Sequence, residues 1–329
     1  MKNNYQMMYM KSPINLSNHN KKGILLINLG TPDSPSVLSV GRYLRTFLMD
    51  KRVIELPYIF RWALVHGLII PFRTPSSAKL YKKIWCSKGS PLLINSQEFA
   101  ESLNSYLGDE YEVSLGMRYG EPSISNACRA LLNKECNEIV VVPLFPQYSS
   151  AATGSALEEV YRFFAKEEEI PQVTLINEFY QARFYIRSLA KHIYHYIQSL
   201  EFDCLLMSYH GLPKKFQTYR QQCALTSKLI AQTLGLSEKQ YAYSFQSRLG
   251  RLEWLKPYTD EILKDLRDKG VKNLVVACPS FVADCLETLE EINIGIREEW
   301  MALGGENFYY IPCMNSNPDW IKAFANFVN

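Results

Sequence analysis

The sequence predicts an α/β protein with two similar halves, each a parallel sheet flanked by helices. Three observations support this prediction. Eight short apolar runs recur along the 329 residues, helical stretches separate most of them, and a segment of the first half resembles a segment of the second. Because parallel strands are joined by helical crossovers, this alternation is typical of sheets that helices cover on both faces.

The predicted strands are continuous apolar runs, as expected for strands that are buried on both faces. In chain order they span residues 24–29, 113–117, 139–144, 173–176, 204–209, 241–246, 274–277 and 308–311. The stretches between most of them have helical character, which gives the β–α–β rhythm.

The internal repeat relates residues 111–120 to residues 241–250, where YEVSLGMRYG and YAYSFQSRLG share Tyr, Ser, Arg and Gly. The next strands also correspond, IVVVPLFP with LVVACPSF. We therefore predict a first domain at 21–178, completed by a C-terminal helix at 317–329, and a second domain at 179–316. A ligand site is expected between them, because pockets favour domain interfaces.

Composition and missing motifs exclude several classes of protein. At 47% hydrophobic and 21% charged residues, with a net charge of only +3, the chain is typical of a soluble globular protein and carries no basic footprint for nucleic acid. The loop at 28–33 lacks the glycine patterns that bind nucleotide phosphates, and no G-x-S-x-G elbow is present. Residues 1–20 lack a signal-peptide core, so we predict a disordered tail on a cytoplasmic protein.

The longest apolar run, at 62–72, is interrupted by His66 and Gly67 and ends at Pro71. It is too short to span a bilayer. We expect a core helix, with an apolar lip at a pocket mouth or a membrane-resting surface as the alternatives.

The eight cysteines form no C-x-x-C pair and no zinc-like spacing, so reduced thiols are predicted. Cys285 stands beside Asp284, but its apolar neighbours favour a packed thiol over a metal ligand.

The segment at 275–292, VVACPSFVADCLETLEEI, carries the strongest functional signal because it joins a buried strand to an acidic helix. At about 100° per residue, an α-helix puts four apolar side chains on one face and three carboxylates opposite: Leu286, Leu289, Ile292 and Ile296 against Asp284, Glu287 and Glu291. Taken alone, this row also fits a solvated helix face.

A second segment favours a functional site. The strand run at 204–209 leads into His210 and Gly211, followed by Pro213. In an open parallel sheet, groups just past the carboxyl ends of strands line the ligand crevice, so His210 and the carboxylate row are expected to share one space. Imidazole and carboxylates in one crevice indicate a metal or proton-transfer site.

Six sequence blocks in order resemble the ferrochelatase family: LLINLGTPDSP, GMRYGEPSI, PLFPQYSSAATGS, SYHGLP, SFQSRLGRLEWLKPYTDE and ADCLETLEEI. The resemblance runs from about Gly23 to the C-terminus. It implies two Rossmann-like, chelatase-type domains with the active-site cleft between them. It also implies insertion of Fe²⁺ into protoporphyrin IX, the terminal step of haem biosynthesis, with release of two protons.

The resemblance assigns catalytic roles to His210 and Glu287, which match the family's active-site histidine and the carboxylate opposite it. We take His210 as proton acceptor and both His210 and Glu287 as transient Fe²⁺ ligands, with Asp284 and Glu291 extending a proton or metal path from Glu287. Whether the histidine takes protons or delivers iron stays open. One imidazole with a few carboxylates suits brief holding of Fe²⁺, whereas a tight cage would trap it.

The resemblance also implies six substrate-binding residues. Leu29 is at a wall position, and Arg73 and Ser90 are at the positions that bind propionates. Arg118 and Tyr119 match an Arg-Tyr pair near the site, and Trp254 matches a tryptophan that stacks on the ring.

Some relatives bind a [2Fe–2S] cluster through a C-terminal extension and one internal cysteine. Here Ser150 stands at the internal position and the sequence ends at Asn329, so no cluster and no tightly bound cofactor are expected. We expect a cytoplasmic monomer that associates loosely with the inner membrane, since its substrate is an apolar macrocycle.

Two other functions remain open at this point. One is a two-lobed binding protein that carries a tetrapyrrole or metal without reacting. The other is a chelatase that inserts Co²⁺ or Ni²⁺ into a different tetrapyrrole, since His210 and Glu287 suit any of these metals.

Overall fold

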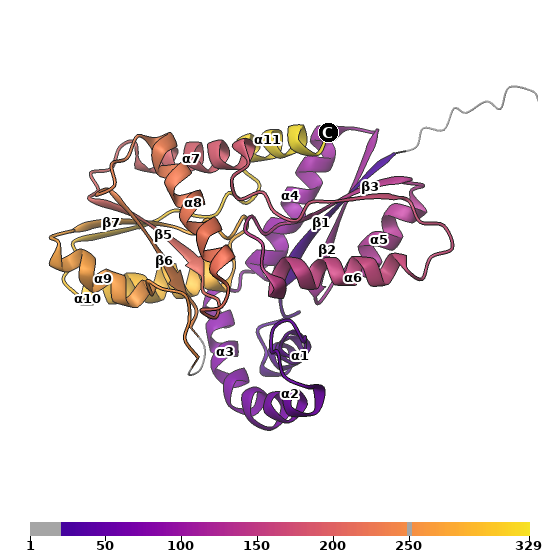
Figure 1. Cartoon of the computed structure of the whole chain (residues 1–329), viewed down its shortest axis with the longest axis horizontal. Coiled ribbons are helices and arrows are strands. Elements are labelled where there is room, and N and C mark those ends of the chain that lie inside the picture. Colours follow the sequence, from indigo (N-terminus) through magenta and orange to yellow (C-terminus); the bar gives the residue numbers. More distant parts are fainter. Residues whose placement is uncertain (1–20, 249–251) are drawn as a thin grey trace, which may run out of the picture.

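The computed structural model describes residues 21–248 and 252–329. Over these residues the chain forms two four-stranded parallel sheets side by side, with strand orders β2-β1-β3-β4 and β6-β5-β7-β8 (Figure 1). This arrangement confirms the predicted fold class. The predicted tail at 1–20 lies outside the described residues.

The first sheet contains β1 (Lys22–Gly30), β2 (Tyr111–Tyr119), β3 (Glu138–Pro143) and β4 (Gln172–Leu175). Helix α4 (Pro91–Leu107) covers one face, and the other is covered by α5 (Ile124–Asn133) and α6 (Ser155–Phe164). Alternate residues of β1 face these two layers, Leu26 toward α4 and Ile27 toward α5 and α6. The strand is therefore apolar throughout its centre.

The second sheet repeats this plan with β5 (Cys204–His210), β6 (Tyr241–Gln246), β7 (Asn273–Ala277) and β8 (Asn307–Tyr310). One face is covered by α7 (Arg183–Ile197) and α8 (Gln217–Leu234), and the other by α9 (Thr259–Asp268), η3 (Glu287–Ile296) and α10 (Arg297–Ala302). The repeated segments occupy equivalent places, since β2 and β6 are both edge strands beside the first strand of their sheet.

All eight predicted strands are present; β1, β2, β5 and β7 extend beyond their apolar runs, β6 matches its run, and β3, β4 and β8 begin and end one residue earlier than predicted. In β1 and β2, Lys22 pairs with Tyr111, two residues before either run begins. Apolar composition marks only the part of a strand that is covered on both faces. The ends of these strands keep their backbone pairing while their side chains reach water. The apolar pattern therefore understates the length of the strands that extend beyond it.

Short polar side chains fix where several helices begin. The Ser36 hydroxyl accepts a hydrogen bond from the Ser39 amide at the start of α1 (Val37–Leu48), and Ser123 does the same for Asn126 at the start of α5. Asn317 caps α11 (Pro318–Val328) through the Asp319 amide. Such caps satisfy amides that have no partner within the helix.

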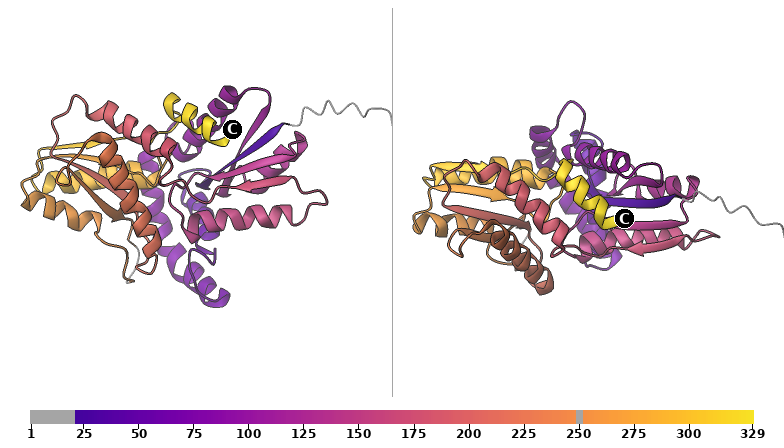
Figure 2. Two further views of the ribbon diagram at one scale, coloured as in Figure 1. Left: turned by 45° about the horizontal axis from the view of Figure 1, so that its top comes forward. Right: turned by 90° about the horizontal axis from the view of Figure 1, so that it is seen from above.

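The two sheets share one hydrophobic core through the C-terminal helix. In α11, Trp320 and Phe324 are buried against Phe99 of α4 and Phe184 of α7. Figure 2 shows α11 lying across the junction between the halves. Its packing on α4 supports our proposal that residues 317–329 complete a first domain at 21–178, while its packing on α7 ties that domain to 179–316.

A helical projection lies below the sheets in Figure 1, and we call it the lid: α1 (Val37–Leu48), α2 (Tyr58–Leu64), η1 (Val65–Ile69) and α3 (Ile70–Ile84). The prediction of a core helix at 62–72 is wrong, because Trp62 is 50% exposed and Phe72 is 73% exposed. Val65, on the inner side of the lid, is fully buried. Among the described residues, no sheet covers the outer side of α2.

Across the described ranges, no helix is both long enough and apolar enough to cross a membrane. The eight cysteines are free thiols, as predicted, and all are buried except Cys86.

Candidate active site

A cleft of about 1030 Å³, including part of its open mouth, lies where the lid meets both sheets. The lid contributes the aromatic rings of Tyr43, Phe47 and Tyr81. The end of β1 and the residue after it contribute small and apolar groups, from Leu29, Gly30 and Thr31. The second half contributes the imidazole of His210 and the carboxylate of Glu287. The cleft is thus mainly apolar, with two groups suited to proton or metal chemistry.

His210 is the last residue of β5, and its imidazole lines the cleft. Its Nδ1 lies 2.7 Å from the Gly211 carbonyl oxygen, which can only accept, so Nδ1 carries the proton of that hydrogen bond. In the neutral ring Nε2 is then the basic nitrogen. The Tyr219 hydroxyl donates to the His210 carbonyl at 2.9 Å and holds the strand end in place.

Glu287 opens η3 and lines the same cleft. Beside it are the buried hydroxyls of Tyr43 and Tyr81 and the Cys285 thiol. Burial raises the pKa of each of these three groups well above its usual value, and the negative charge of Glu287 raises it further. All three therefore stay protonated beside the carboxylate.

Glu291 lies one turn further along η3, away from the cleft lining. Its carboxylate accepts hydrogen bonds from the Ser247 amide at 2.7 Å, from the Ser247 hydroxyl at 2.5 Å and from Gln246 Nε2 at 3.3 Å. Burial raises the pKa of Glu291, and the Ser247 hydrogen bonds and the charge of nearby His210 offset only part of that rise. Glu291 can therefore hold a proton at a higher pH than an exposed glutamate.

The acidic helix differs from the α-helix that its sequence predicts. From Glu287 to Ile296 it is a π-helix, a wide form that often occurs at functional sites. Each residue turns through less than 100°, so the predicted single apolar face is wrong. Leu286 lines the cleft and packs near Val40 and Tyr81, whereas Ile292 lies in the core of the second sheet.

Asp284 precedes the π-helix, is only 5% exposed and does not line the cleft. Its carboxylate accepts hydrogen bonds from the Tyr310 hydroxyl (2.5 Å), the Thr288 hydroxyl (3.0 Å), the Cys313 amide (3.2 Å) and Asn315 Nδ2 (2.7 Å). These four donors join the start of η3 to the segment after β8. The geometry thus favours a supporting role for Asp284 over a place in a path from the cleft.

We expect Asp284→Ala to lower the free energy of unfolding by about 3 kcal/mol, because it leaves four buried donors without their charged acceptor. Urea titration followed by circular dichroism measures this loss. Asp109→Ala removes an exposed acid in a turn and is the matched control, with an expected change within about 0.5 kcal/mol. Equal stability of the two variants would contradict the supporting role.

Two of the six predicted substrate-binding residues line the cleft. Leu29 lies on its wall, and Ser90, at the start of α4, forms a 2.7 Å hydrogen bond with Thr31. Arg73 instead projects from α3 into solvent, and no carboxylate of the described residues lies within ion-pair distance of it. Its guanidinium is not part of the cleft lining.

Arg118 and Tyr119, at the end of β2, lie outside the cleft lining and hold the loop after α1. Arg118 Nη2 and the Tyr119 hydroxyl contact the same Asp50 oxygen at 2.8 and 2.9 Å, and the Ser155 hydroxyl also reaches it. Burial opposes ionisation of Asp50, but the hydrogen bonds from Ser155, the Arg52 amide and Tyr119 outweigh it and lower its pKa. The pair is therefore a brace between the lid and the first sheet.

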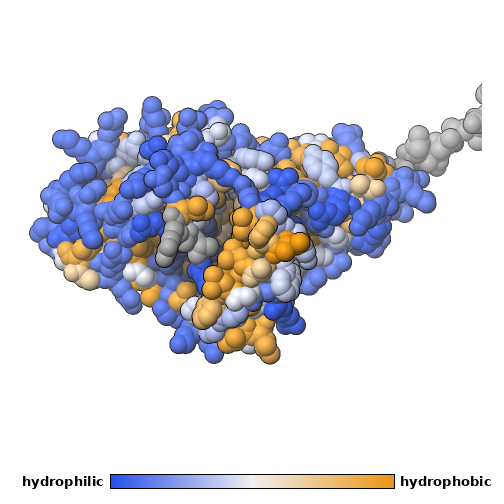
Figure 3. Space-filling model, turned by 60° about the horizontal axis from the view of Figure 1, so that its bottom comes forward, coloured by the Kyte–Doolittle hydropathy of each residue, from blue (hydrophilic) through white to orange (hydrophobic). Residues whose placement is uncertain are grey.

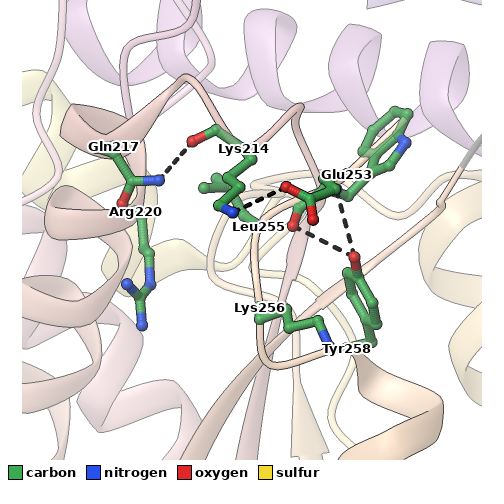
Figure 4. Close-up of a pocket in the computed structure, with 8 residues that line it drawn as sticks. Lys214, Gln217, Arg220, Glu253, Leu255, Lys256 and Tyr258 are labelled. Carbon is green, nitrogen blue, oxygen red and sulfur yellow. Dashed lines mark hydrogen bonds and ion pairs between the residues drawn. The ribbon is translucent and has the colours of Figure 1, made fainter.

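Figure 4 shows a second cavity, of about 460 Å³, beside Lys214, Glu253 and Tyr258. Trp254 lines this cavity rather than the main cleft. Its backbone pairs with Pro213, three residues after His210, so it backs the segment that leaves the histidine. The other lining residues are mostly charged and exposed, with Lys214 and Glu253 in an ion pair at 2.8 Å.

Several cleft residues had no signal in the sequence pattern. Tyr43 and Tyr81 are more than a hundred positions from His210 and belong to lid helices whose apolar residues resemble those of any core helix. Phe281 follows Pro279 in the segment whose acidic residues gave the functional signal, but nothing in the sequence pattern marks this phenylalanine as a cleft residue. Gln246 and Ser247 stand in the SFQSRLG block, but only the fold brings them to Glu291.

The fold is shared with chelatases of known structure. SirB from Bacillus subtilis with Fe³⁺ superposes with a TM-score of 0.57 over 94% of each chain, at 14% identity. The sirohydrochlorin chelatase SirB from Bacillus subtilis subspecies spizizenii, in complex with cobalt, gives the same TM-score over 93% of each chain. The chain therefore has the fold of a chelatase.

Sequence comparison identifies the family of chelatases to which the chain belongs. The ferrochelatase family model matches residues 21–329. A ferrochelatase of Legionella pneumophila (strain Lens) is 51% identical over 331 residues, covering 94% of this chain and 99% of the relative. Another, from Coxiella burnetii (strain Dugway 5J108-111), is 46% identical and covers 94% of each. The chain belongs to the ferrochelatase family, which confirms the resemblance of the six blocks.

Proposed function

We propose that this chain inserts Fe²⁺ into protoporphyrin IX, giving protohaem and two protons, with His210 as proton acceptor and Glu287 as metal ligand. Membership of the ferrochelatase family makes it an enzyme of haem biosynthesis, a protohaem ferro-lyase. The observation that carries the residue roles is that His210 and Glu287 line one apolar, aromatic cleft. Such a cleft suits a flat apolar macrocycle that presents its nitrogens to both groups.

The charges of the reaction balance when two pyrrole N–H protons leave for each divalent ion that enters. His210 Nε2 accepts a proton because Nδ1 already donates to Gly211. Glu287 supplies a negative charge for the metal, which is held by too few ligands to be trapped. Glu291, whose pKa burial raises, takes protons onward from the site.

The remaining predicted residues have graded roles in this proposal. Leu29 and Ser90 form part of the cleft wall. Arg73, free on the lid, binds a propionate at the mouth once substrate is present. Arg118, Tyr119, Trp254 and Asp284 act indirectly, by bracing the lid, the His210 segment and the start of η3.

We also propose that Fe²⁺ is only a substrate and that the enzyme works without a [2Fe–2S] cluster. At the internal position where some relatives carry a cluster cysteine, the Ser150 hydroxyl accepts a hydrogen bond from Arg52 at 3.0 Å. Iron and acid-labile sulfide analysis of the purified protein tests this proposal.

Anaerobic incubation with Fe²⁺ and protoporphyrin IX tests the main proposal, followed by the change from porphyrin to haem absorbance. Turnover is the expected result. Lack of turnover would overturn the proposal, and turnover with coproporphyrin alone would move the assignment to a different porphyrin substrate. Parallel reactions with Co²⁺ and Ni²⁺ measure metal selectivity.

We propose that the enzyme is a cytoplasmic monomer that rests loosely on the inner membrane through its lid. Six apolar lid side chains are between 50% and 76% exposed: Tyr58, Ile59, Phe60, Trp62, Leu68 and Phe72. In Figure 3 apolar surface gathers on the face that the lid presents. Residues 58–97 carry six Lys or Arg and no Asp or Glu, a charge pattern that favours anionic lipid.

Replacing Phe60, Trp62 and Phe72 together by serine is expected to lower the fraction bound to phosphatidylglycerol vesicles at least about tenfold, since each large apolar side chain contributes ~1.5–3 kcal/mol when buried. Co-sedimentation measures the bound fraction. Tyr161→Ser with Ile170→Ser removes two equally exposed apolar side chains outside the lid and is expected to change little. Unchanged binding of the lid variant would overturn the membrane contact.

A further inference from the structure

The last residue of β6, Gln246, lies behind the catalytic groups rather than in the cleft. It is 3% exposed and pairs with His210 across the sheet. Its carbonyl oxygen accepts a hydrogen bond from the Gly211 amide at 2.8 Å. Because the Gly211 carbonyl accepts the hydrogen bond from His210 Nδ1, the backbone of Gln246 holds the residue whose carbonyl orients the imidazole.

The side chain of Gln246 reaches the other half of the site. Its Nε2 donates to the Glu287 carbonyl oxygen at 2.8 Å and to a Glu291 carboxylate oxygen at 3.3 Å. Its Oε1 accepts from the Ser208 hydroxyl at 2.7 Å. Both partners of Nε2 are oxygens that accept, and the Ser208 hydroxyl supplies a donor on the opposite side, so the amide has one favourable orientation.

The surroundings leave Gln246 without a substitute. Ser208 is fully buried and is itself held by the Thr259 hydroxyl at 3.2 Å. The Glu287 carbonyl belongs to the first turn of the π-helix, where Gln246 is the side chain that meets it. Loss of the amide would remove a side-chain donor from the Glu287 carbonyl and another from the Glu291 carboxylate, so the start of this helix would no longer be tied to β6.

We infer that Gln246 is a positioning residue that couples the proton acceptor to the acidic helix. Its backbone carbonyl holds Gly211, the partner of the His210 imidazole. Its side chain holds the backbone of Glu287 and the carboxylate of Glu291. It does not touch the cleft, so it acts through these residues and not on the substrate. This inference rests on the proposed function, because it concerns the relative placement of His210 and Glu287.

The test is Gln246→Met, which keeps the length and approximate volume of the side chain and removes its donor. The expected result is a fall in kcat of about 10–100-fold, the usual effect of losing a group that orients site residues, with KM for protoporphyrin IX changed less than about threefold. Rates are expressed per folded enzyme from a urea titration of each variant.

Two further variants separate positioning from packing. Ser208→Ala leaves Gln246 in place but removes the hydrogen bond that orients its amide, and kcat is expected to fall about fivefold with the same unchanged KM. Gln222→Met alters another buried glutamine, 7% exposed and bonded to Glu178 and the Tyr148 amide, and kcat per folded enzyme is expected to stay within about twofold.

The wild-type reaction with Fe²⁺ is measured first. Absence of wild-type turnover would count against the proposed function, whereas the ratio of variant to wild-type rates tests the inference. A Gln246→Met enzyme with kcat within threefold of wild type would overturn it. A loss shared equally by Gln222→Met, or carried by KM instead of kcat, would also overturn it.

Discussion

His210→Ala is expected to abolish iron insertion, with kcat reduced by at least about 10³-fold, while porphyrin binding and stability stay close to wild type. In the proposed function the imidazole is the base of the cleft, and a positioned general base typically contributes ~10²–10⁴-fold. Its side chain makes a hydrogen bond only to the neighbouring Gly211, so its removal leaves no distant partner unsatisfied among the described residues.

The measurement is anaerobic haem formation, with porphyrin affinity from fluorescence quenching and stability from urea titration. His195→Ala is the matched control, because that imidazole is exposed on α7, far from the cleft lining. Retained turnover in His210→Ala would refute its role as proton acceptor. Loss of porphyrin binding would instead assign it to the cleft wall.

Glu287→Gln is expected to lower kcat at least about 100-fold, because it removes the negative charge of the cleft at nearly constant shape and electrostatic stabilisation is often the largest single contribution to catalysis. Porphyrin affinity is expected to change less than threefold, since the aromatic and aliphatic lining is intact. Steady-state kinetics with varied Fe²⁺ and varied porphyrin separate the two effects.

Glu290→Gln provides the control within the same helix. Glu290 pairs with Lys83 of the lid at 2.8 Å and is absent from the cleft lining, so its variant is expected to stay within about threefold of wild type. A near-wild-type rate for Glu287→Gln would return this carboxylate to an ordinary helix face. Equal losses in both variants would mean that the net charge of the helix matters rather than Glu287.

The strands and the two central site residues could be predicted because their causes are local. A strand buried on both faces must be apolar, and the residue that follows it in a parallel sheet lies at the ligand edge. His210 ends β5, Glu287 opens the helix reached after β7, and both line the cleft.

The roles of the three acids could not be separated from sequence, because their contacts come from distant segments. Asp284 is covered by Tyr310 and Asn315, and Glu291 by Ser247, whereas Glu287 alone of the three lines the cleft. The prediction of an α-helix with one apolar face was wrong as well, because apolar spacing does not distinguish an α-helix from the wider π-helix.

The prediction that residues 62–72 form a core helix was wrong for a related reason. An apolar helix has the same composition whether it faces a core or an exposed surface, and only the absence of a second layer behind α2 decides between them. Family resemblance supplied Arg118, Tyr119 and Trp254, but resemblance conveys proximity to a site without stating whether a side chain faces the substrate.

The shared core around α11 has a consequence for how substrate enters. Trp320 and Phe324 belong to the same hydrophobic cluster as residues of both sheets, so opening the cleft by swinging one half away from the other would expose that cluster to water. The walls formed by the two sheets are therefore fixed relative to each other. We therefore expect substrate to enter past the lid, whose tyrosines line the cleft and whose outer surface is apolar. In the proposed function the same few helices then admit the macrocycle and contact the membrane in which it dissolves.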